Sequence, residues 1–359
     1  MGGKNLRILF LGEPKSANTQ SWITGLRNAG CELMLASARS DGSDEAVPIG
    51  NPYLPPRLRL LFGVHSVKKI ISSFRPDILI AYRVTSYGYL AAQSGFQPLV
   101  MAAQNEKIVS DFSPKILRPL LSHFASKAIS RATLLHAWSE NVASGLLHFG
   151  ARPEQILTMH RGIDTETFSP PVHERDFSPD KIRIISTRSL YPQYKLDKLL
   201  YSFAVLKKDF EKASLTIAGD GPLLEDLRNL ASSLGLKESV SFTGKLPPAK
   251  ISELLKQSTA YVSLIETEGL SSSLLEACSC GVLPAVADIQ ASRELVQDQK
   301  NGIILKSDDP QRLASALGAA LRNRSFMADA SAYNTRLIRE KYDRSRNIEI
   351  FLENYRKLL

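Results

Sequence analysis

The sequence has few cysteines, and it lacks the glycine motifs of the commonest nucleotide-binding enzymes. Three cysteines among 359 residues cannot form a disulfide framework, so a reducing compartment is the simpler assumption. Neither G-x-G-x-x-G nor G-x-x-x-x-G-K-[ST] occurs anywhere in the chain. The dehydrogenase and P-loop interpretations therefore lose their main support.

Long apolar runs are also missing. The longest uncharged stretch, residues 84–105, contains serine, glutamine and proline, which is typical of a helix and a strand in water rather than of a membrane span. The apolar run near the N-terminus, residues 8–11, is too short for a signal peptide. We therefore predict a cytoplasmic protein.

Acidic residues are outnumbered, and the imbalance lies mostly in the first half. The formal net charge is +9, and residues 1–165 contain 18 Lys and Arg against 11 Asp and Glu. Such a balance favours an anionic partner. Because neither zinc-finger spacing nor interleaved aromatic and basic residues occur, we expect no nucleic-acid partner. Two basic amphipathic segments, residues 55–74 and 113–131, suit either an anionic membrane surface or ordinary helices packed on a sheet.

Short apolar strands alternate with helix-length segments along most of the chain, which predicts parallel sheets covered on both faces. The alternation restarts after a stretch rich in proline and charge. We expect an N-terminal doubly wound domain at residues 1–168, a linker at 169–181 and a second doubly wound domain at 182–332. A final amphipathic segment at 333–359 has no strand after it.

Polar residues follow the predicted strands of the second domain, where open parallel sheets bind ligands. Arg188 and Lys195 follow one strand, and a guanidinium with an ammonium suits a diphosphate. Standing alone, the pair is more typical of solvated surface charges. Gly219 and Gly221 follow the next strand, where they allow either close approach of a ligand or a left-handed turn.

The stretch ETEGLSSSLLEACSCG contains two carboxylates around the start of a helix. Ser271–Ser273 are natural N-caps and Gly281 is a natural residue to follow the helix, so its free N–H groups suit an anion. Glu268 precedes this helix and Glu276 lies inside it, and carboxylates accept hydrogen bonds well from the vicinal hydroxyls of a sugar. The alternative is that Glu268 favours the helix dipole and Glu276 is an exposed surface residue.

This region resembles the signature of the family 4 retaining glycosyltransferases, whose E-x7-E motif falls on Glu268 and Glu276. The blocks SENVASGLLHFGARPEQILTMHRGIDTETFSP, STRSLYPQYKLDKLLYSF, LTIAGDGPLLEDL and FTGKLPPAKISELLKQS match in order, so the resemblance is close over residues 139–305. It implies an α/β protein of the GT-B fold, with two Rossmann-like, doubly wound domains facing an interdomain cleft. It also implies that the segment 333–359 crosses back to the first domain.

The resemblance implies a role for each matching residue. Arg188 and Lys195 would stabilise the leaving nucleotide, and Glu268 would lie at the donor sugar. The other donor-binding positions would be Glu276, Gly219, Gly221, Lys245, Leu246, Gly269, Leu270 and Ser271. Departing negative charge is stabilised by preorganised cations and a helix N-terminus. Because no D-x-D and no histidine pair at ligand spacing occur, we expect no metal and no cofactor beyond the UDP- or GDP-linked donor.

The first domain departs from the family pattern. The loop after the first strand reads GEPKSANTQS instead of carrying a Gly-Gly pair, and Gln104 and Asn105 stand where many members have a histidine. These amides can bind hydroxyls on the acceptor side but cannot titrate like an imidazole. We therefore expect a hexosyl or N-acetylhexosaminyl transferase that acts on a glycan or lipid-linked acceptor in cell-surface polysaccharide synthesis. The alternative is an inactive nucleotide-sugar-binding protein on the same fold.

Overall fold

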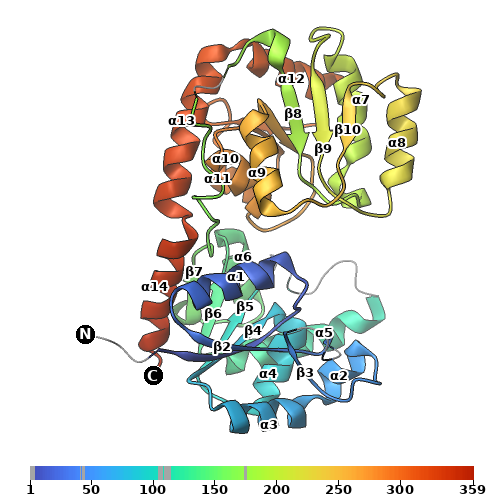
Figure 1. Cartoon of the computed structure of the whole chain (residues 1–359). Helices are drawn as coiled ribbons and strands as arrows, with labels where there is room; N and C mark the ends of the chain where they lie inside the picture. The colour runs from blue at the N-terminus through green and yellow to red at the C-terminus, as the bar shows by residue number, and fades with distance from the viewer. Residues whose placement is uncertain (1–4, 41, 43–44, 104–107, 109–114, 174–175) are drawn as a thin grey trace. The chain divides into compact units, whose positions relative to one another are not determined.

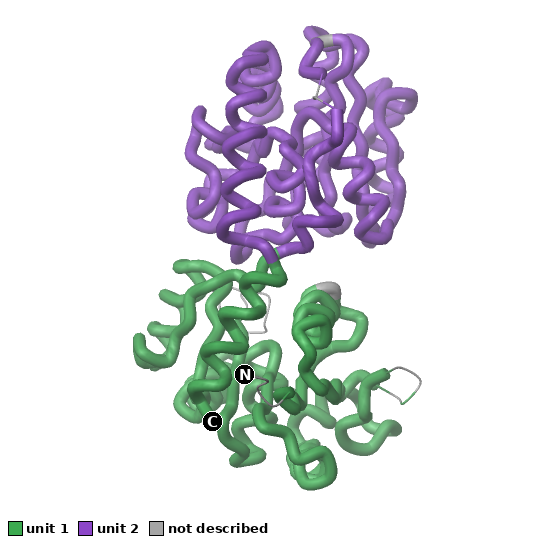
Figure 2. Tube along the Cα trace, turned by 60° about the vertical axis from the view of Figure 1, so that its left-hand side comes forward, with its two compact units in different colours: residues 1–162, 344–359 green, residues 163–343 purple. Residues whose placement is uncertain are grey.

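The computed structural model describes residues 5–359 except 41, 43–44, 104–107, 109–114 and 174–175. It divides into two compact units, residues 1–162 with 344–359 and residues 163–343 (Figure 2). The divisions differ from the expected boundaries after residues 168 and 332. The reason is that the Ile163 amide donates to the Tyr342 carbonyl at 2.8 Å and the Thr165 hydroxyl to Asp343 at 2.5 Å, which ties both crossing points of the chain into the second unit.

The first unit is built on a seven-stranded sheet whose described pairings are all parallel. Its strands stand in the order β3-β2-β1-β4-β5-β6-β7. They are β1 (Arg7–Leu11), β2 (Glu32–Ser37), β3 (Val47–Pro48), β4 (Ile78–Tyr82), β5 (Leu99–Ala102), β6 (Leu134–Ala137) and β7 (Ile156–Thr158). All five residues of β4 are buried, as expected for a strand covered on both faces.

Helices cover both faces of this sheet (Figure 1). They are α1 (Ala17–Asn28), α2 (Pro56–Phe62), α3 (Val64–Phe74), α4 (Tyr89–Ser94), α5 (Arg118–Arg131), α6 (Glu140–His148) and α14 (Arg344–Arg356). Alternate residues of β1 enter different cores: Leu9 and Leu11 pack with α3 to α6, whereas Ile8 and Phe10 pack with α1 and α14. This alternation follows from the two-residue period of a strand.

Helix α14 completes the second of these cores. The Tyr355 hydroxyl lies 2.7 Å from Nε2 of His136 on β6, and the Trp22 ring packs edge-on against both Trp138 and His136. Burial lowers the pKa of His136 to about 3, so the imidazole is neutral and structural. The final segment of the chain forms two helices rather than one. The first, α13 (Arg324–Lys341), belongs to the second unit, and the second, α14, belongs to the first unit.

The second unit repeats the architecture with six parallel strands in the order β10-β9-β8-β11-β12-β13. They are β8 (Arg183–Ser186), β9 (Ser214–Ile217), β10 (Val240–Phe242), β11 (Ala260–Ser263), β12 (Leu283–Ala287) and β13 (Ile303–Leu305). Its helices are α7 (Leu196–Leu206), α8 (Leu224–Ser233), α9 (Pro248–Gln257), α10 (Ser272–Ser279), α11 (Gln290–Leu295), α12 (Pro310–Arg322) and α13. The prediction of two Rossmann-like domains is confirmed.

Each sheet has one point at which successive crossovers change direction. In the first unit this switch point lies between β1 and β4, and in the second between β8 and β11. Open α/β sheets bind ligands beyond the carboxyl ends of the strands at such points. Among the described residues, none of the helices combines the length and the apolar character needed to cross a bilayer.

Candidate active site

Arg188 connects the two strands that flank the switch point of the second unit. It follows β8 and is only 6% exposed. Its Nη2 lies 2.5 Å from the Glu268 carboxylate, which follows β11, and its Nη1 donates to the hydroxyls of Ser271 at 2.6 Å and Ser273 at 2.8 Å. The Tyr194 ring lies 4.5 Å from the guanidinium carbon. The fork is therefore fixed in position before any ligand arrives.

The carboxyl of Glu268 lies in the same buried setting. Burial raises its pKa, and the adjacent Arg188 guanidinium lowers the pKa only in part. Burial would also lower the pKa of Arg188, but Tyr261, Glu268 and Tyr194 reverse this, so the guanidinium stays protonated. The Arg188–Glu268 pair is thus a mostly buried ion pair, with side-chain exposures of 7% and 21%, whose members depend on each other.

The sequence predicts that Lys195 and Arg188 bind a diphosphate together. In the structure, the Lys195 ammonium is already paired with carboxylates. Its Nζ lies 2.8 Å from the Glu266 carboxylate and 3.2 Å from the Asp308 carboxylate. The hydrogen bond to Glu266 is the main cause that raises the pKa of Lys195. Two carboxylates thus pair with one ammonium, so they compete with a diphosphate for the charge of Lys195.

Helix α10 begins where Arg188 and Glu268 meet. The expected helix is confirmed, and Gly281 follows its C-cap with a φ of 72°, in the left-handed region that glycine favours. Ser271 is the N-cap, yet its hydroxyl accepts from Arg188 instead of capping the helix. The N–H groups of the first turn therefore keep no side-chain cap from Ser271, and the positive end of the helix dipole faces the site.

The remaining residues of the predicted donor site lie on α10 and on loops that follow strands of the same sheet. Glu276 is half-buried within α10, Gly269 is half-buried, and Leu270 is buried in the loop before the helix. Lys245 and Leu246 follow β10, two strands away from β8, and Lys245 is exposed. The structure thus places the predicted donor residues at the carboxyl edge of one sheet.

Gly219 and Gly221 have a structural reason that sequence reasoning did not identify. A Cβ on Gly219 would lie 2.1 Å from the Arg188 carbonyl oxygen, and one on Gly221 would lie 2.6 Å from the Leu190 carbonyl oxygen. Neither has a positive φ, so the alternative of a left-handed turn is wrong. Both glycines let the loop after β9 pack on the loop that carries Arg188.

Several side chains of the site were not predicted. Glu266 lies in the loop after β11, as Glu268 does, and this position in the sequence could have identified it. Asp308 lies 113 residues from Lys195 in the sequence, so only folding brings them together. Tyr261 is buried on β11, and its hydroxyl lies 3.1 Å from Ser273. The predicted acceptor-side residues Gln104 and Asn105 fall outside the described residues.

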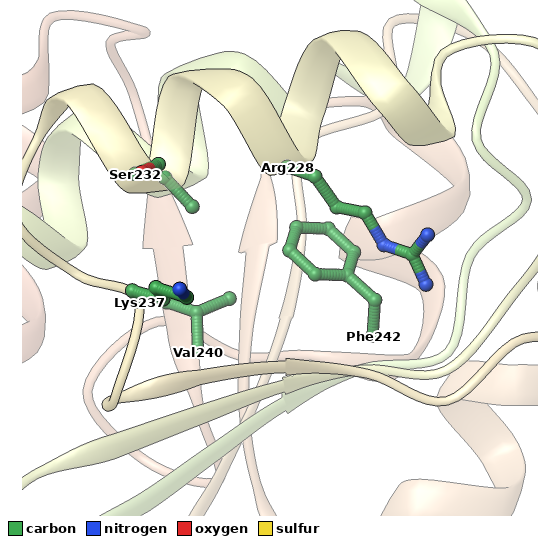
Figure 3. A pocket seen from close by; sticks show the side chains of 6 residues that line it. Arg228, Ser232, Lys237, Val240 and Phe242 are labelled. Atoms are coloured by element: carbon green, nitrogen blue, oxygen red, sulfur yellow. The ribbon is translucent and has the colours of Figure 1, made fainter.

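A pocket of about 310 Å³ lies elsewhere in the second unit, between α8 and β10 (Figure 3). It is lined by Arg228, Ala231, Ser232, Lys237, Val240 and Phe242. None of these belongs to the predicted site. Among the described residues, no group of three or more His, Cys, Asp and Glu side chains is arranged to hold a metal ion.

Two family models each match one half of this chain. Residues 19–167 match the model of Glycosyltransferase Family 4, and residues 173–337 match that of Glycosyl transferases group 1. An uncharacterised glycosyltransferase of Methanocaldococcus jannaschii is 26% identical over 70% of this chain and 66% of its own length. A GDP-mannose-dependent alpha-(1-6)-phosphatidylinositol monomannoside mannosyltransferase of Mycolicibacterium smegmatis is 24% identical over 75% and 71%. The chain spans 46% of the length of the Mycobacterium tuberculosis enzyme of the same name.

Solved structures show the same fold at low identity. Anabaena Alr3699/HepE in complex with UDP and glucose has a TM-score of 0.79 at 17% identity, covering 99% of this chain and 100% of that one. The sucrose-phosphate synthase of Thermosynechococcus elongatus has a TM-score of 0.81 at 14% identity, covering 99% of each chain. The fold is therefore GT-B. Together with the two family matches, which cover nearly the whole chain, this means that the protein belongs to the family 4, group 1 glycosyltransferases.

Proposed function

We propose that this protein transfers a hexose or N-acetylhexosamine, with retention of configuration, from a UDP- or GDP-linked donor to a hydroxyl of a glycan or lipid-linked acceptor. The observation that carries the proposal is the buried fork of Arg188, held by Glu268, Ser271 and Ser273 at the start of α10. Names of relatives and structural neighbours include GDP-mannose, UDP and UDP-glucose, which supports this donor class. Retention and a role in cell-surface polysaccharide synthesis are inferred from the family resemblance.

Transfer of the sugar requires the site to stabilise the nucleoside diphosphate that leaves. Arg188 and the first turn of α10, which takes no side-chain cap from Ser271, supply positive charge where the negative charge develops, and their fixed positions avoid a reorganisation cost. Lys195 would add a second cation once the phosphate displaces Glu266 or Asp308. Glu276 would accept hydrogen bonds from the ribose hydroxyls, and Glu268 would orient Arg188 beside the sugar. We propose that these groups suffice without a metal ion.

Donor binding is expected to depend on Glu276. A nucleotide at a hundred times its dissociation constant should stabilise the protein by about 2.7 kcal/mol. In a thermal-shift series with UDP, GDP and ADP, we expect one nucleotide to raise the melting temperature and Glu276→Ala to remove the shift. Glu253→Ala, which alters an exposed glutamate on α9, is the matched control. An unchanged shift in Glu276→Ala would show that the ribose is bound elsewhere.

One observation favours the alternative of a nucleotide-sugar-binding protein without transferase activity. The ammonium of Lys195 is held by two carboxylates, which compete with a diphosphate for it. Tight donor binding with no release of nucleoside diphosphate, across varied acceptors, would support this alternative. Slow donor hydrolysis in the absence of acceptor would support transfer.

We also propose that the first unit binds the cytoplasmic face of an anionic membrane, where a lipid-linked acceptor would lie. Residues 46–76 contain five Lys and Arg but no Asp or Glu. An interfacial patch of exposed apolar side chains lies in this segment and consists of Tyr53, Leu54, Leu58, Leu61 and Phe62. Tyr53 is 94% and Phe62 72% exposed. An apolar surface beside excess positive charge is typical of interfacial binding.

Hydrogen bonds from Arg59 fix the backbone that carries the interfacial patch. Arg59 of α2 is buried, and its guanidinium donates to the carbonyls of Leu54 at 2.8 Å, Ser40 at 2.6 Å and Pro52. These bonds fix the backbone while the apolar side chains point outward. The exposure of the interfacial patch is therefore part of the folded structure.

The double substitution Tyr53→Ser with Phe62→Ser is expected to weaken binding to vesicles that contain anionic phosphatidylglycerol by about tenfold or more. A large apolar side chain contributes about 1.5–3 kcal/mol when buried, and about 1.4 kcal/mol corresponds to tenfold. Vesicle co-sedimentation measures the effect. Val172→Ser, at a residue that is 97% exposed in the second unit, should leave binding unchanged. Equal binding by all variants, or by neutral vesicles, would contradict the proposal.

A further inference from the structure

The first unit has its own charged cluster at its switch point. Glu13 follows β1 and Arg83 follows β4, the two strands between which the crossovers change direction. Arg83 Nη1 lies 2.8 Å from the Glu13 carboxylate, and Arg39 Nε, beyond the end of β2, lies 3.3 Å from the same oxygen. A carboxylate and a guanidinium thus meet at the carboxyl edge of both sheets of this protein. Glu13, Arg39 and Arg83 are not among the predicted donor-binding residues.

A third guanidinium lies at this edge. Arg161 follows β7, is 4% exposed, and its Nη2 donates to Asn18 Oδ1 at 2.6 Å. Burial raises the pKa of Tyr82, while the nearby charges of Arg161 and Arg83 both lower it. Among the described side chains of this edge, Arg39 and Arg83 contact Glu13, and Arg161 adds a third guanidinium, which is bonded to Asn18.

The backbone and the polar atoms around Arg83 are held in an unfavourable state. Arg83 has a φ of 79°, in the left-handed region that residues other than glycine rarely adopt, and it begins a short π-helix, η1 (Arg83–Gly88). Strained residues and π-helical turns are concentrated at functional sites. The buried atoms Arg83 Nε, Ser86 Oγ and Thr19 Oγ1 have no hydrogen-bond partner, although Thr19 is fully buried. Unpaired buried polar atoms are rare unless a ligand or water completes them.

We propose that this edge of the first sheet is a subsite for an oxyanion, a phosphate or carboxylate group carried by the acceptor. Each guanidinium has five N–H donors in a planar fork, and Glu13 accepts only one contact from each of Arg83 and Arg39. The remaining donors, with those of Ser86 and Thr19, suit the several oxygens of such a group. Glu13 holds Arg83 and Arg39 in position, and their charge exceeds its own. That the anion belongs to the acceptor rests on the proposed transferase function; the subsite itself does not.

The test uses the full chain with UDP present, so that phosphate does not enter the diphosphate site near Arg188. Inorganic phosphate should raise the melting temperature above that in sodium chloride of equal ionic strength. Arg39→Gln and Arg83→Lys should weaken phosphate binding about tenfold or more. Arg228→Gln, which alters an exposed arginine paired with Glu225 in the second unit, should not. Because Arg39 is 60% exposed, its substitution does not endanger the fold.

The source of the oxyanion is distinguished by three further probes: glycerol 1-phosphate, methyl glucuronide and the neutral methyl glucoside. Binding of the phosphate ester alone assigns a phosphorylated acceptor, and binding of the glucuronide assigns an acidic sugar. Equal binding of the neutral glucoside, or phosphate binding that survives in both arginine variants, overturns the subsite, as does the absence of any phosphate effect. If phosphate binds here but no nucleotide binds the second unit, the subsite stands and the proposed function fails.

Discussion

Arg188→Lys is expected to lower kcat/KM for donor turnover by about two to three orders of magnitude. Removing one preorganised donor at a site of developing charge typically costs about 10²–10³ in rate. Lysine keeps the charge, but it lacks the planar fork with which Arg188 reaches Glu268, Ser271 and Ser273 at once. The measurement is the rate of nucleoside diphosphate release from the donor.

The control for this variant is Arg183→Lys, which alters an exposed arginine at the opposite end of the same strand. It should turn over donor at the rate of the unmodified protein. Both variants need melting temperatures close to that of the parent, so that a lost rate reports chemistry and not unfolding. Near-parental turnover in Arg188→Lys would remove Arg188 from the proposed mechanism.

Arg188→Met is expected to reduce the free energy of unfolding by about 1–3 kcal/mol, because it leaves the mostly buried Glu268 carboxylate without its cation. A second substitution, Glu268→Gln, removes the stranded charge and should recover much of this loss. Urea denaturation of the two single variants and the double variant measures the coupling. A double variant no more stable than Arg188→Met would show that Glu268 does not depend on Arg188.

This loss should also depend on pH. Burial raises the pKa of Glu268 in the folded protein above its value in the unfolded chain. A group with a raised folded pKa contributes stability below its unfolded pKa and loses that contribution as the pH rises through the folded pKa. Without Arg188 the carboxyl should protonate more readily, so Arg188→Met should be closer to the parent in stability at about pH 5 than at about pH 8. The double variant should lack this dependence.

The local pattern of the sequence was sufficient for most of the donor site. Four strands with polar residues after them could be recognised, and helix α10 could be delimited by Ser271 and Gly281, because N-cap and left-handed positions restrict the residue type. The spacing of Glu268 and Glu276 then led to the family. These features depend on neighbours within a few residues, which a sequence contains directly.

Other features depended on distant contacts. The carboxylates of Glu266 and Asp308 neutralise Lys195, although Asp308 comes from a loop beyond β13. Gly219 was interpreted through ligands or turns, but it is required by the carbonyl of Arg188 on a neighbouring loop. The break between α13 and α14 was also missed, because no glycine or proline marks it in the sequence.

By itself, then, the sequence determined two doubly wound domains, a family and the residue types of a donor site, because strand period, helix caps and motif spacing are short-range properties. Only the tertiary structure decided how these charges are paired. It joined Arg188 to Glu268 across β8 and β11, and Arg83 to Glu13 across β1 and β4, because parallel strands place residues distant in sequence at one edge of a sheet. The energy of a charge depends on the partners and burial that this edge provides, and no local pattern specifies them.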